Sequence, residues 1–437
     1  MTDITTEKAR IGAPSAQPFI NGFTEEGENL SPVNTGTNTS TTSEQPSAGP
    51  LAGASAKSHS HGGGVGIPDS SRAGRLTSYK LADFKPLNGL EEDWRFTPLK
   101  RLRGLHTEVL NGAAPAVSVT APAGVVVETV GRDDKRIGQA AIPEDLVSAN
   151  AWENFAEATV VTVPAELQAE NEVSVLITGA GEAPSAQHIV IVAERFSKAV
   201  VVLDHQGSAV VSENVEIIVE DGAELTVVSL QEWADNAVHA SSQQAKIGRD
   251  AKFKHIVVSL GGDLVRVTPS TRFTAPGADV EMFGLYFADA GQHLEQRLFV
   301  DHAVANCKSR VLYKGALQGR NAHSVWVGDV LIRKEAEGTD TYEANRNLVL
   351  TDGARADSVP NLEIETGLID GAGHASATGR FDDEHLFYLM ARGIPEKVAR
   401  RLVVRGFLNE IIQQIKVPAI EERLTAAVER ELAATDN

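Results

Sequence analysis

Short apolar runs that recur through the middle of the chain are the feature that most restricts its fold. Between residues 188 and 365 these runs are rich in Val, Ile and Leu, and glycine turns separate many of them. They lie at residues 189–192, 199–203, 215–219, 225–230, 256–260, 325–332 and 348–350. Small β-branched side chains suit closely stacked strands better than a helical bundle. The middle of the chain is therefore predicted to be mainly β.

One type of turn recurs between these runs. It combines a glycine with small or acidic neighbours, as in Asp221-Gly222-Ala223 and Pro276-Gly277-Ala278, and it returns roughly every 25 to 45 residues. Glycine accepts the positive φ of a tight corner, and a small following residue allows close stacking on the next coil. This self-similarity favours a β-solenoid. A β-sandwich stays open as an alternative, because strands separated by turn signals also describe that fold.

The regions before the solenoid differ in character. Residues 1–75 are dominated by Ser, Thr, Gly, Asn, Pro and Ala. They are predicted to be a disordered tail, because they cannot bury enough apolar area to offset the entropy of ordering. Residues 76–185 are predicted to form an N-terminal α/β region. In it, a helix over residues 88–97 is expected to dock on the core through Trp94 and Phe96.

The solenoid is expected to occupy residues 186–375, and a helical domain to follow at residues 376–437. Gly393 followed by Pro395 predicts the end of one helix and the start of the next. An apolar stripe at helical spacing and two aromatic residues upstream form a candidate partner-binding surface. A cap packed on the chain's own solenoid is the alternative for the stripe. The candidate residues are Phe387, Tyr388, Val404, Leu408, Ile411 and Ile415.

Charge and cysteine content exclude several classes of protein. The formal net charge of −19 repels phosphate backbones, so nucleic acid is not an expected partner. Cys307 is the single cysteine, which excludes an internal disulfide and any four-thiolate cluster site built by this chain alone. There is no apolar run of about 18 residues and no basic region followed by an apolar core. The sequence therefore predicts a cytoplasmic protein with no membrane partner.

Missing motifs narrow the chemistry further. No Gly-Lys dipeptide occurs, so the chain has no Walker A loop and no ATP site of that kind. The Gly-x-Ser-x-Gly, His-Glu-x-x-His and Cys-x-x-Cys patterns are also missing. These absences disfavour nucleophilic hydrolases and zinc hydrolases, and we expect no catalytic residue.

Histidines of the second half are the remaining candidates for metal or redox chemistry. His293, His302 and His323 lie there together with Cys307. Strand periodicity places His293 and Glu295 on the same face. For each of these histidines, a structural hydrogen bond on the solenoid is the alternative to metal binding. Cys307 is either a buried thiol or, if its basic neighbours fold around it, a thiol with a lowered pKa.

His374 stands apart from the other histidines. It is expected in a Gly- and Ala-rich turn between the last strand-like run and a helix, where rigid elements would hold its imidazole. This context predicts a contact with a metal or a partner. The pieces around it are Pro360-Asn361-Leu362-Glu363-Ile364, Phe387-Tyr388-Leu389 and Arg405-Gly406-Phe407.

In this order, these pieces resemble the SufB/SufD family, the scaffold proteins of SUF iron–sulfur cluster assembly. The resemblance extends over residues 90–415 and includes Gly284-Leu285-Tyr286 and Asp301-His302. It implies a right-handed parallel β-helix between an N-terminal helical region and a C-terminal helical domain. It also implies pairing of a SufD chain with SufB, and docking of a SufC ATPase on each C-terminal domain. A transient iron or iron–sulfur cluster would form at the SufB–SufD interface.

Within the family, the chain looks like SufD rather than SufB. The position matching a SufB cysteine is assigned to Asn345, which supplies no thiolate. The interface histidine of SufD carries over onto His374, although Ala372-Gly373 replaces the Cys-Ser that commonly precedes it. His374 would then be a nitrogen ligand at an interface whose thiolates come from SufB. A flavin is left open for the complex only.

Other functions stay open from the sequence. One is a SufB-like paralogue. Another is a homo-oligomeric solenoid scaffold with no metal, because the unpaired edge of a sheet can pair with a second chain and isolated chains could form homodimers. A third is a solenoid enzyme acting on polysaccharides. The scarcity of aromatic residues, 5% of the chain, argues against this enzyme because sugar grooves present stacking rings.

Overall fold

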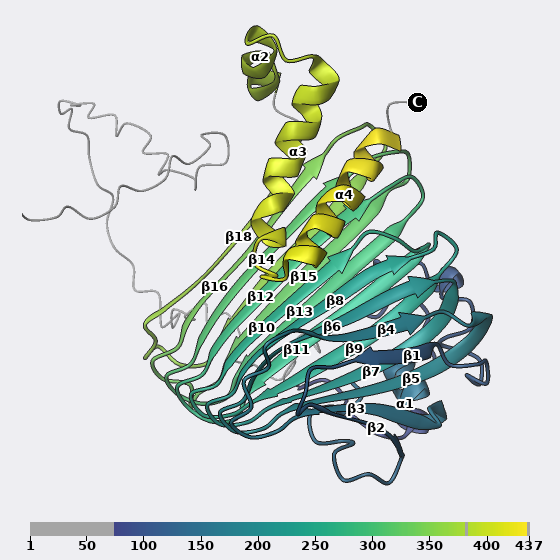
Figure 1. The fold of residues 1–437 in the computed structure, drawn as a ribbon, viewed down its shortest axis with the longest axis vertical. Coiled ribbons are helices and arrows are strands. Elements are labelled where there is room, and N and C mark those ends of the chain that lie inside the picture. Colours follow the sequence, from purple (N-terminus) through teal and green to yellow (C-terminus); the bar gives the residue numbers. More distant parts are fainter. Residues whose placement is uncertain (1–73, 381–382, 435–437) are drawn as a thin grey trace, which may run out of the picture. The chain divides into compact units, whose positions relative to one another are not determined.

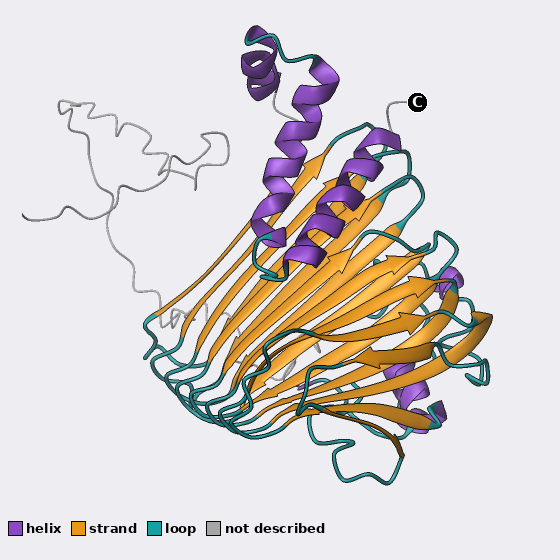
Figure 2. Cartoon of the chain, viewed as in Figure 1, coloured by secondary structure: helices purple, strands orange, loops and turns teal. Residues whose placement is uncertain are grey.

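The computed structural model describes residues 74–380 and 383–434. The tail predicted at residues 1–75 lies outside the described residues except for Gly74 and Arg75. The described chain is mainly β and forms a solenoid of about 8 turns with a few helices at its two ends, as predicted (Figures 1 and 2).

Two sheets of nine strands each make up the solenoid. The first contains, in spatial order, β1 (Ala116–Thr120), β4 (Val173–Thr178), β6 (Lys198–Gly207), β8 (Glu224–Trp233), β10 (Lys252–Ser259), β12 (Asp279–Ala288), β14 (Lys308–Leu317), β16 (Asp340–Val349) and β18 (Gly371–Arg380). The second contains β17 (Arg355–Ile364), β15 (His323–Ile332), β13 (His293–His302), β11 (Leu264–Phe273), β9 (Val238–Ile247), β7 (Ala209–Val219), β5 (Gly181–Ala193), β3 (Glu157–Val163) and β2 (Val126–Gly131).

Strand pairing distinguishes this fold from a sandwich. From β4 and β3 onward, each strand pairs in parallel with the strand two places later in the chain, for example Val201 of β6 with Val227 of β8. The antiparallel pairs lie at the start, between β1 and β4 and between β2 and β3. A sandwich would be built from antiparallel sheets. The parallel stacking therefore rules out the alternative that the spacing had left open.

The recurring turns hold the corners of the coils. Gly222, Gly277 and Gly353 have φ values of 69°, 88° and 87°, which residues with a Cβ rarely adopt. At the corner of residues 248–251, Asp250 takes the positive φ of 52° instead of the glycine. The glycine turns predicted at Gly222 and Gly277 are thus confirmed.

Alternation along the strands builds the interior. Residues two apart, such as Val201 and Leu203 in β6 or Leu225 and Val227 in β8, belong to one large buried cluster between the two sheets. Some aligned positions stack apolar residues on apolar ones from coil to coil, as Val201 on Val227. The interior is therefore mainly apolar, and the early coils also contain a group of hydrogen-bonded polar side chains that includes His205, Ser229, Gln231 and Gln243.

The N-terminal region differs from the prediction. Instead of a helix over residues 88–97, the chain forms successive turns, with Gly89 at a φ of 84° and the carboxylate of Glu91 accepting the backbone N–H of Asn88 and Gly89. Trp94 is nonetheless buried on the core, as predicted. The helices here are η2 (Leu81–Asp83), η3 (Leu99–Leu102) and α1 (Leu146–Asn154).

The C-terminal region is helical, with α2 (Asp383–Ala391), α3 (Glu396–Ile412) and α4 (Pro418–Ala434). Gly393, at a φ of 83°, lies between α2 and α3 where the sequence predicted a helix end. Helices α3 and α4 lie over the sheet of even-numbered strands (Figure 1). Arg423 of α4 contacts Asp204 of β6 at 2.7 Å, and Lys314 of β14 contacts Glu410 of α3. We call α3 and α4 the helical cap.

Two strands extend across predicted domain boundaries. Strand β5 crosses the boundary at residues 185 and 186, and β18 crosses the one at residues 375 and 376. Parallel pairing begins as early as β3 and β4, because the first Val-rich strands already stack on the next coil. No helix among residues 74–380 and 383–434 is long and apolar enough to cross a membrane.

Candidate functional site

His374 lies in the last strand of the solenoid, and the turn predicted for it is wrong. It belongs to β18, where its small neighbours allow the backbone to continue the ladder on β16. Its register partner on β16 is Glu343, and its Nδ1 lies 3.8 Å from Glu343 Oε1. The His374 side chain is 43% exposed, whereas that of Glu343 is completely buried. An accessible imidazole thus stands over a buried carboxyl group.

Glu343 is held in an unusual environment. Neither of its carboxyl oxygens forms a hydrogen bond of ordinary geometry with any described residue. Burial, with a contribution from the nearby Asp329 carboxylate, raises the pKa of Glu343 to about 8. Glu343 is therefore largely protonated at neutral pH and can release its proton when a cation approaches. This property makes the pair of His374 and Glu343 a candidate site, and sequence reasoning missed Glu343.

Asn345, the position assigned to a SufB cysteine, is a structural residue in this chain. It is fully buried, and its Nδ2 donates to Tyr286 Oη at 2.9 Å and to the backbone oxygen of Tyr313 at 3.3 Å. Its Oδ1 accepts from Asn347 and Ser358. The amide is committed to this network, which crosses the interior of the last coils.

His293 and Glu295 lie on one face, as the strand periodicity predicted. His293 Nε2 is 3.0 Å from Glu295 Oε2, and its Nδ1 is 3.1 Å from Nδ1 of His323 on the next coil. His323 Nε2 in turn lies 2.7 Å from Asp357 Oδ2. Thr97 donates to the same Glu295 oxygen at 2.7 Å. This hydrogen-bonded chain joins three coils and anchors the N-terminal segment, which agrees with the structural alternative for these histidines.

His302 and Cys307 lie in the interior. His302 Nε2 is 2.9 Å from Ser309 Oγ, and burial lowers the pKa of His302 to about 3. Cys307 is completely buried, and burial raises the pKa of its thiol. A neutral imidazole and a protonated thiol in these positions fit packing and hydrogen bonding rather than redox chemistry.

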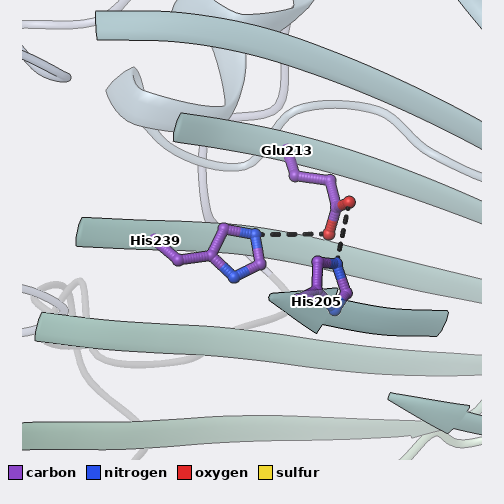
Figure 3. Close-up of side chains that lie close together, drawn as sticks. All are labelled: His205, Glu213 and His239. Carbon is purple, nitrogen blue, oxygen red and sulfur yellow. Dashed lines mark hydrogen bonds and ion pairs between the residues drawn. The ribbon is translucent and has the colours of Figure 1, made fainter. Parts of the chain in front are cut away.

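A cluster of three buried ionisable residues lies in the early coils, and sequence reasoning missed it as well. Among the described residues, His205, Glu213 and His239 are the group whose ligand atoms lie within 4.8 Å of one another (Figure 3). Burial acts to raise the pKa of Glu213, but the two histidines outweigh it and the pKa lies below its usual value. Burial lowers the pKa of His239. A signal was available for two of them, because His205 follows and Glu213 interrupts alternating apolar residues at interior positions of β6 and β7.

The candidate partner-binding residues fall into two groups. Phe387 and Tyr388 of α2 are 72% and 55% exposed. The other four residues are buried within the chain, where α3 packs on α4, β12 and β14. The apolar stripe, three residues of α3 and Ile415 just after it, therefore packs inside the chain and leaves α2 as the accessible part. The buried four are Val404, Leu408, Ile411 and Ile415.

Comparison with known proteins gives a consistent result. Residues 175–407 match the model of the family described as SUF system FeS cluster assembly, SufBD core domain. An iron–sulfur cluster assembly SufBD family protein of Mycobacterium tuberculosis is 56% identical over 370 residues, which cover 83% of this chain and 93% of the relative. One from Mycobacterium leprae is 56% identical over 374 residues, 83% of this chain and 95% of the relative. A second SufBD family protein of Mycobacterium leprae is 27% identical over 201 residues, 46% of this chain and 23% of the relative. The solenoid, its helical cap and these matches together lead to one conclusion: the chain belongs to the SufBD family of iron–sulfur cluster assembly proteins.

Proposed function

We propose that this chain is the SufD-like subunit of a SUF scaffold and contributes to iron capture or cluster formation at an interface with a SufB-like paralogue. The observation that carries the proposal is the end of the solenoid. There, in a chain of the SufBD family, two terminal strands present unpaired edges and one of them carries His374 beside Glu343. The chain acts as a non-catalytic scaffold in this proposal.

The terminal strands support pairing with a second solenoid. Strands β17 and β18 end their sheets, and within the described residues no further strand pairs with their outer edges. Five consecutive residues of β18, from His374 to Thr378, are exposed. Unpaired backbone N–H and C=O groups on such an edge are a template for another strand. Mycobacterium leprae has one SufBD family protein 56% identical to this chain and another 27% identical, which supports a pair of paralogues.

The chemistry of the site supports iron as cargo rather than as a resident cofactor. Imidazole nitrogen and carboxylate oxygen both suit iron, and sulfide clusters additionally need thiolates. Asn345 supplies no thiolate, and Cys307 is buried away from solvent. The thiolates would therefore come from the paralogue, while His374 supplies a nitrogen ligand. Glu343 would ionise as the cation arrives and balance its charge.

Helix α2 supports docking of a SufC-like ABC ATPase. Phe387, Tyr388 and Met390 of α2 are 72%, 55% and 43% exposed, and Val398 and Leu402 of α3 are 44% and 43% exposed. Helices α2 and α3 contact each other. Exposed apolar side chains gathered on adjoining helices mark a protein contact. An ATPase partner would also supply the nucleotide chemistry that a chain without a Walker A loop lacks.

An anaerobic pull-down tests the proposal. Tagged wild-type chain is purified from its native host together with its partners, and iron and acid-labile sulfide are measured on the complex. We expect wild type to retain the paralogue, the ATPase and a cluster. His374→Ala should retain both partners but lose most of the iron and sulfide. Lys246→Ala, an exposed residue of β9 away from the two terminal strands, is the control and should behave as wild type.

A second pair of variants tests the docking surface. Phe387→Glu places a charge in the exposed apolar group of α2 and should release the ATPase while the paralogue stays bound. Ala426→Glu, on α4 and outside this apolar group, is the control and should keep both partners. A wild-type chain that recovers neither partner and forms only homodimers would overturn the SufD-like assignment and favour the metal-free homo-oligomeric scaffold.

A further inference from the structure

We propose that the early coils of the solenoid hold a first-row divalent metal ion, bound by His205, Glu213 and His239. The three side chains come from β6, β7 and β9, so they join strands of both sheets (Figure 3). One ligand atom of each lies within 4.8 Å of the other two. Two imidazole nitrogens and a carboxylate oxygen are a ligand set that suits zinc and ferrous iron.

All three residues occupy interior positions. His205 follows Leu203 by two residues in β6, and Glu213 lies between Val211 and Val215 in β7. Leu203, Val211 and Val215 all belong to the buried apolar cluster. Each of the three ligand side chains is completely buried. An ionisable group at such a position costs several kcal/mol unless a partner or a metal compensates it. The cluster therefore calls for a compensating charge at its centre.

The orientation of His205 supplies a metal-facing lone pair. Its Nδ1 lies 3.0 Å from the backbone oxygen of Leu230, which only accepts hydrogen bonds, and 3.3 Å from the amide Nε2 of Gln231. A neutral ring that donates its Nδ1 proton to the closer Leu230 oxygen has a lone pair on Nε2. That Nε2 faces Glu213 Oε1 at 3.2 Å. Two acceptors that face each other repel unless a cation, either a proton or a metal, lies between them.

His239 is oriented in the same way. Its Nδ1 lies 2.7 Å from Oε1 of Gln231, and the indole N–H of Trp233 is nearer to that oxygen, at 2.9 Å, than to Nδ1, at 3.1 Å. Its Nε2 is buried, faces Glu213 Oε2 at 3.3 Å and forms no hydrogen bond of ordinary geometry with any described residue. Imidazoles that bind metal typically donate their other N–H to a carbonyl or amide oxygen, as both rings do here. Ser241 Oγ donates to Glu213 Oε2 at 2.7 Å and fixes the carboxylate.

The separations are compatible with ligands placed around an ion. Charge-assisted hydrogen bonds between N and O are about 2.7 to 2.9 Å long. The two Nε2-to-oxygen separations here are 3.2 and 3.3 Å, and they run to different oxygens of the Glu213 carboxylate. In a tetrahedron with metal–ligand bonds of about 2.0 to 2.1 Å, neighbouring ligand atoms lie about 3.3 Å apart. Small movements of the carboxylate would then complete the site.

The burial of the cluster indicates a structural site. No ligand side chain is exposed to solvent, so the ion would enter while the chain folds, and its binding free energy would contribute to folding. It would cross-link β6 of one sheet to β7 and β9 of the other. This inference is independent of the proposed scaffold function, because it requires no partner and no cluster chemistry.

Refolding of the full chain tests the proposal. Wild-type protein with a tag that lacks histidine is unfolded in guanidinium with a chelator, freed of both metal and chelator, and refolded anaerobically. Separate refolding reactions contain no metal, Zn²⁺ or Fe²⁺. Bound metal is measured by plasma mass spectrometry after gel filtration, and Tm by circular dichroism. We expect one ion per chain and a Tm that rises with free metal concentration. Retention of either ion supports the site and identifies its metal.

Variants locate the ion. Glu213→Gln and His239→Gln should each lower metal affinity at least 10-fold. His302→Gln, which replaces another fully buried histidine outside the cluster, should bind metal as wild type does. A wild-type chain that retains neither ion, with no rise in Tm, overturns the proposal. So does a Glu213→Gln variant that retains metal as well as wild type. If a variant fails to refold, the wild-type stoichiometry and the rise in Tm decide the question alone.

Discussion

The buried carboxyl group beneath His374 predicts an unusual dependence of stability on pH. The perturbation is Glu343→Gln, which keeps the shape of the side chain but removes its ability to ionise. In wild type, burial and the nearby Asp329 raise the pKa of Glu343 from 4.5 to about 8. Between these two pH values the unfolded chain releases the proton while the folded chain keeps it. The folded state is therefore favoured most below pH 4.5, and stability falls as pH rises towards 8.

The magnitude follows from the size of this pKa difference. Each pKa unit corresponds to about 1.36 kcal/mol, so wild type should lose on the order of 4 kcal/mol between pH 5 and pH 9 through this one group. The variant should lose none of it. Relative to wild type, Glu343→Gln should therefore be close to neutral at pH 5 and markedly stabilised at pH 9.

Guanidinium unfolding at pH 5, 6.5, 8 and 9 measures this difference. The free energies of unfolding of wild type and variant are compared at each pH, so that contributions from all other groups cancel. Ser376→Ala, which changes an exposed residue that does not ionise, is the control and should give a difference that does not change with pH. A pH-independent difference for Glu343→Gln as well would refute the reasoning, because it would mean that Glu343 ionises normally in the folded chain.

Three further predictions concern the packing of the solenoid. Lys314→Met removes a buried ammonium that contacts Glu410 of the helical cap. We expect the free energy of unfolding to fall by about 1 to 3 kcal/mol and amide hydrogen exchange in α3 to become faster. Unchanged exchange in α3 would contradict the role of Lys314 in docking the cap. Gly315→Ala places a Cβ against a buried tyrosine ring and should lower the free energy of unfolding in urea by about 1 to 3 kcal/mol. Gly371→Ala, on the last strand, makes only an ordinary contact and should be nearly neutral. Equal losses for the two variants would argue against close packing of the tyrosine on Gly315. Burial lowers the pKa of His255 to about 4. As pH falls from 6.5 to 4 the unfolded chain gains this proton first, so the free energy of unfolding of wild type should fall by about 3 kcal/mol. His255→Gln should abolish this dependence of stability on pH, and a dependence shared by both proteins would exclude His255 as its source.

The sequence predicted the class of fold because its evidence is local. Apolar runs alternate with period 2, and glycine or small acidic residues mark the corners, as at Gly222 and Gly277. Both signals depend on a few neighbouring residues and on the geometry of a single turn. The helix break at Gly393 and the burial of Trp94 follow from equally local chemistry.

The prediction failed where distant contacts override local preference. His374 lies among Gly, Ala and Ser, which is typical of a turn, yet pairing with β16 makes this segment a strand. The stripe at Val404 and Leu408 had left a docking surface and a cap open, and its burial by β12, β14 and α4 agrees with the cap. Residues 88–97 combine helix-like spacing with a glycine at positive φ, and the turns prevail.

The sequence by itself determined the mainly β fold and the resemblance to the family, and it favoured a solenoid, since these depend on periodicity, turn chemistry and the succession of motifs. Only the tertiary structure decided which side chains meet. His205 and His239 are 34 residues apart, and Glu343 is 31 residues from His374. Glu343 and His374 are register partners on neighbouring strands, whereas His205 and His239 lie in different sheets and meet across the interior. The length of a coil also varies with its loops. A separation in sequence therefore does not give the alignment of one coil on the next, and that alignment creates both candidate sites.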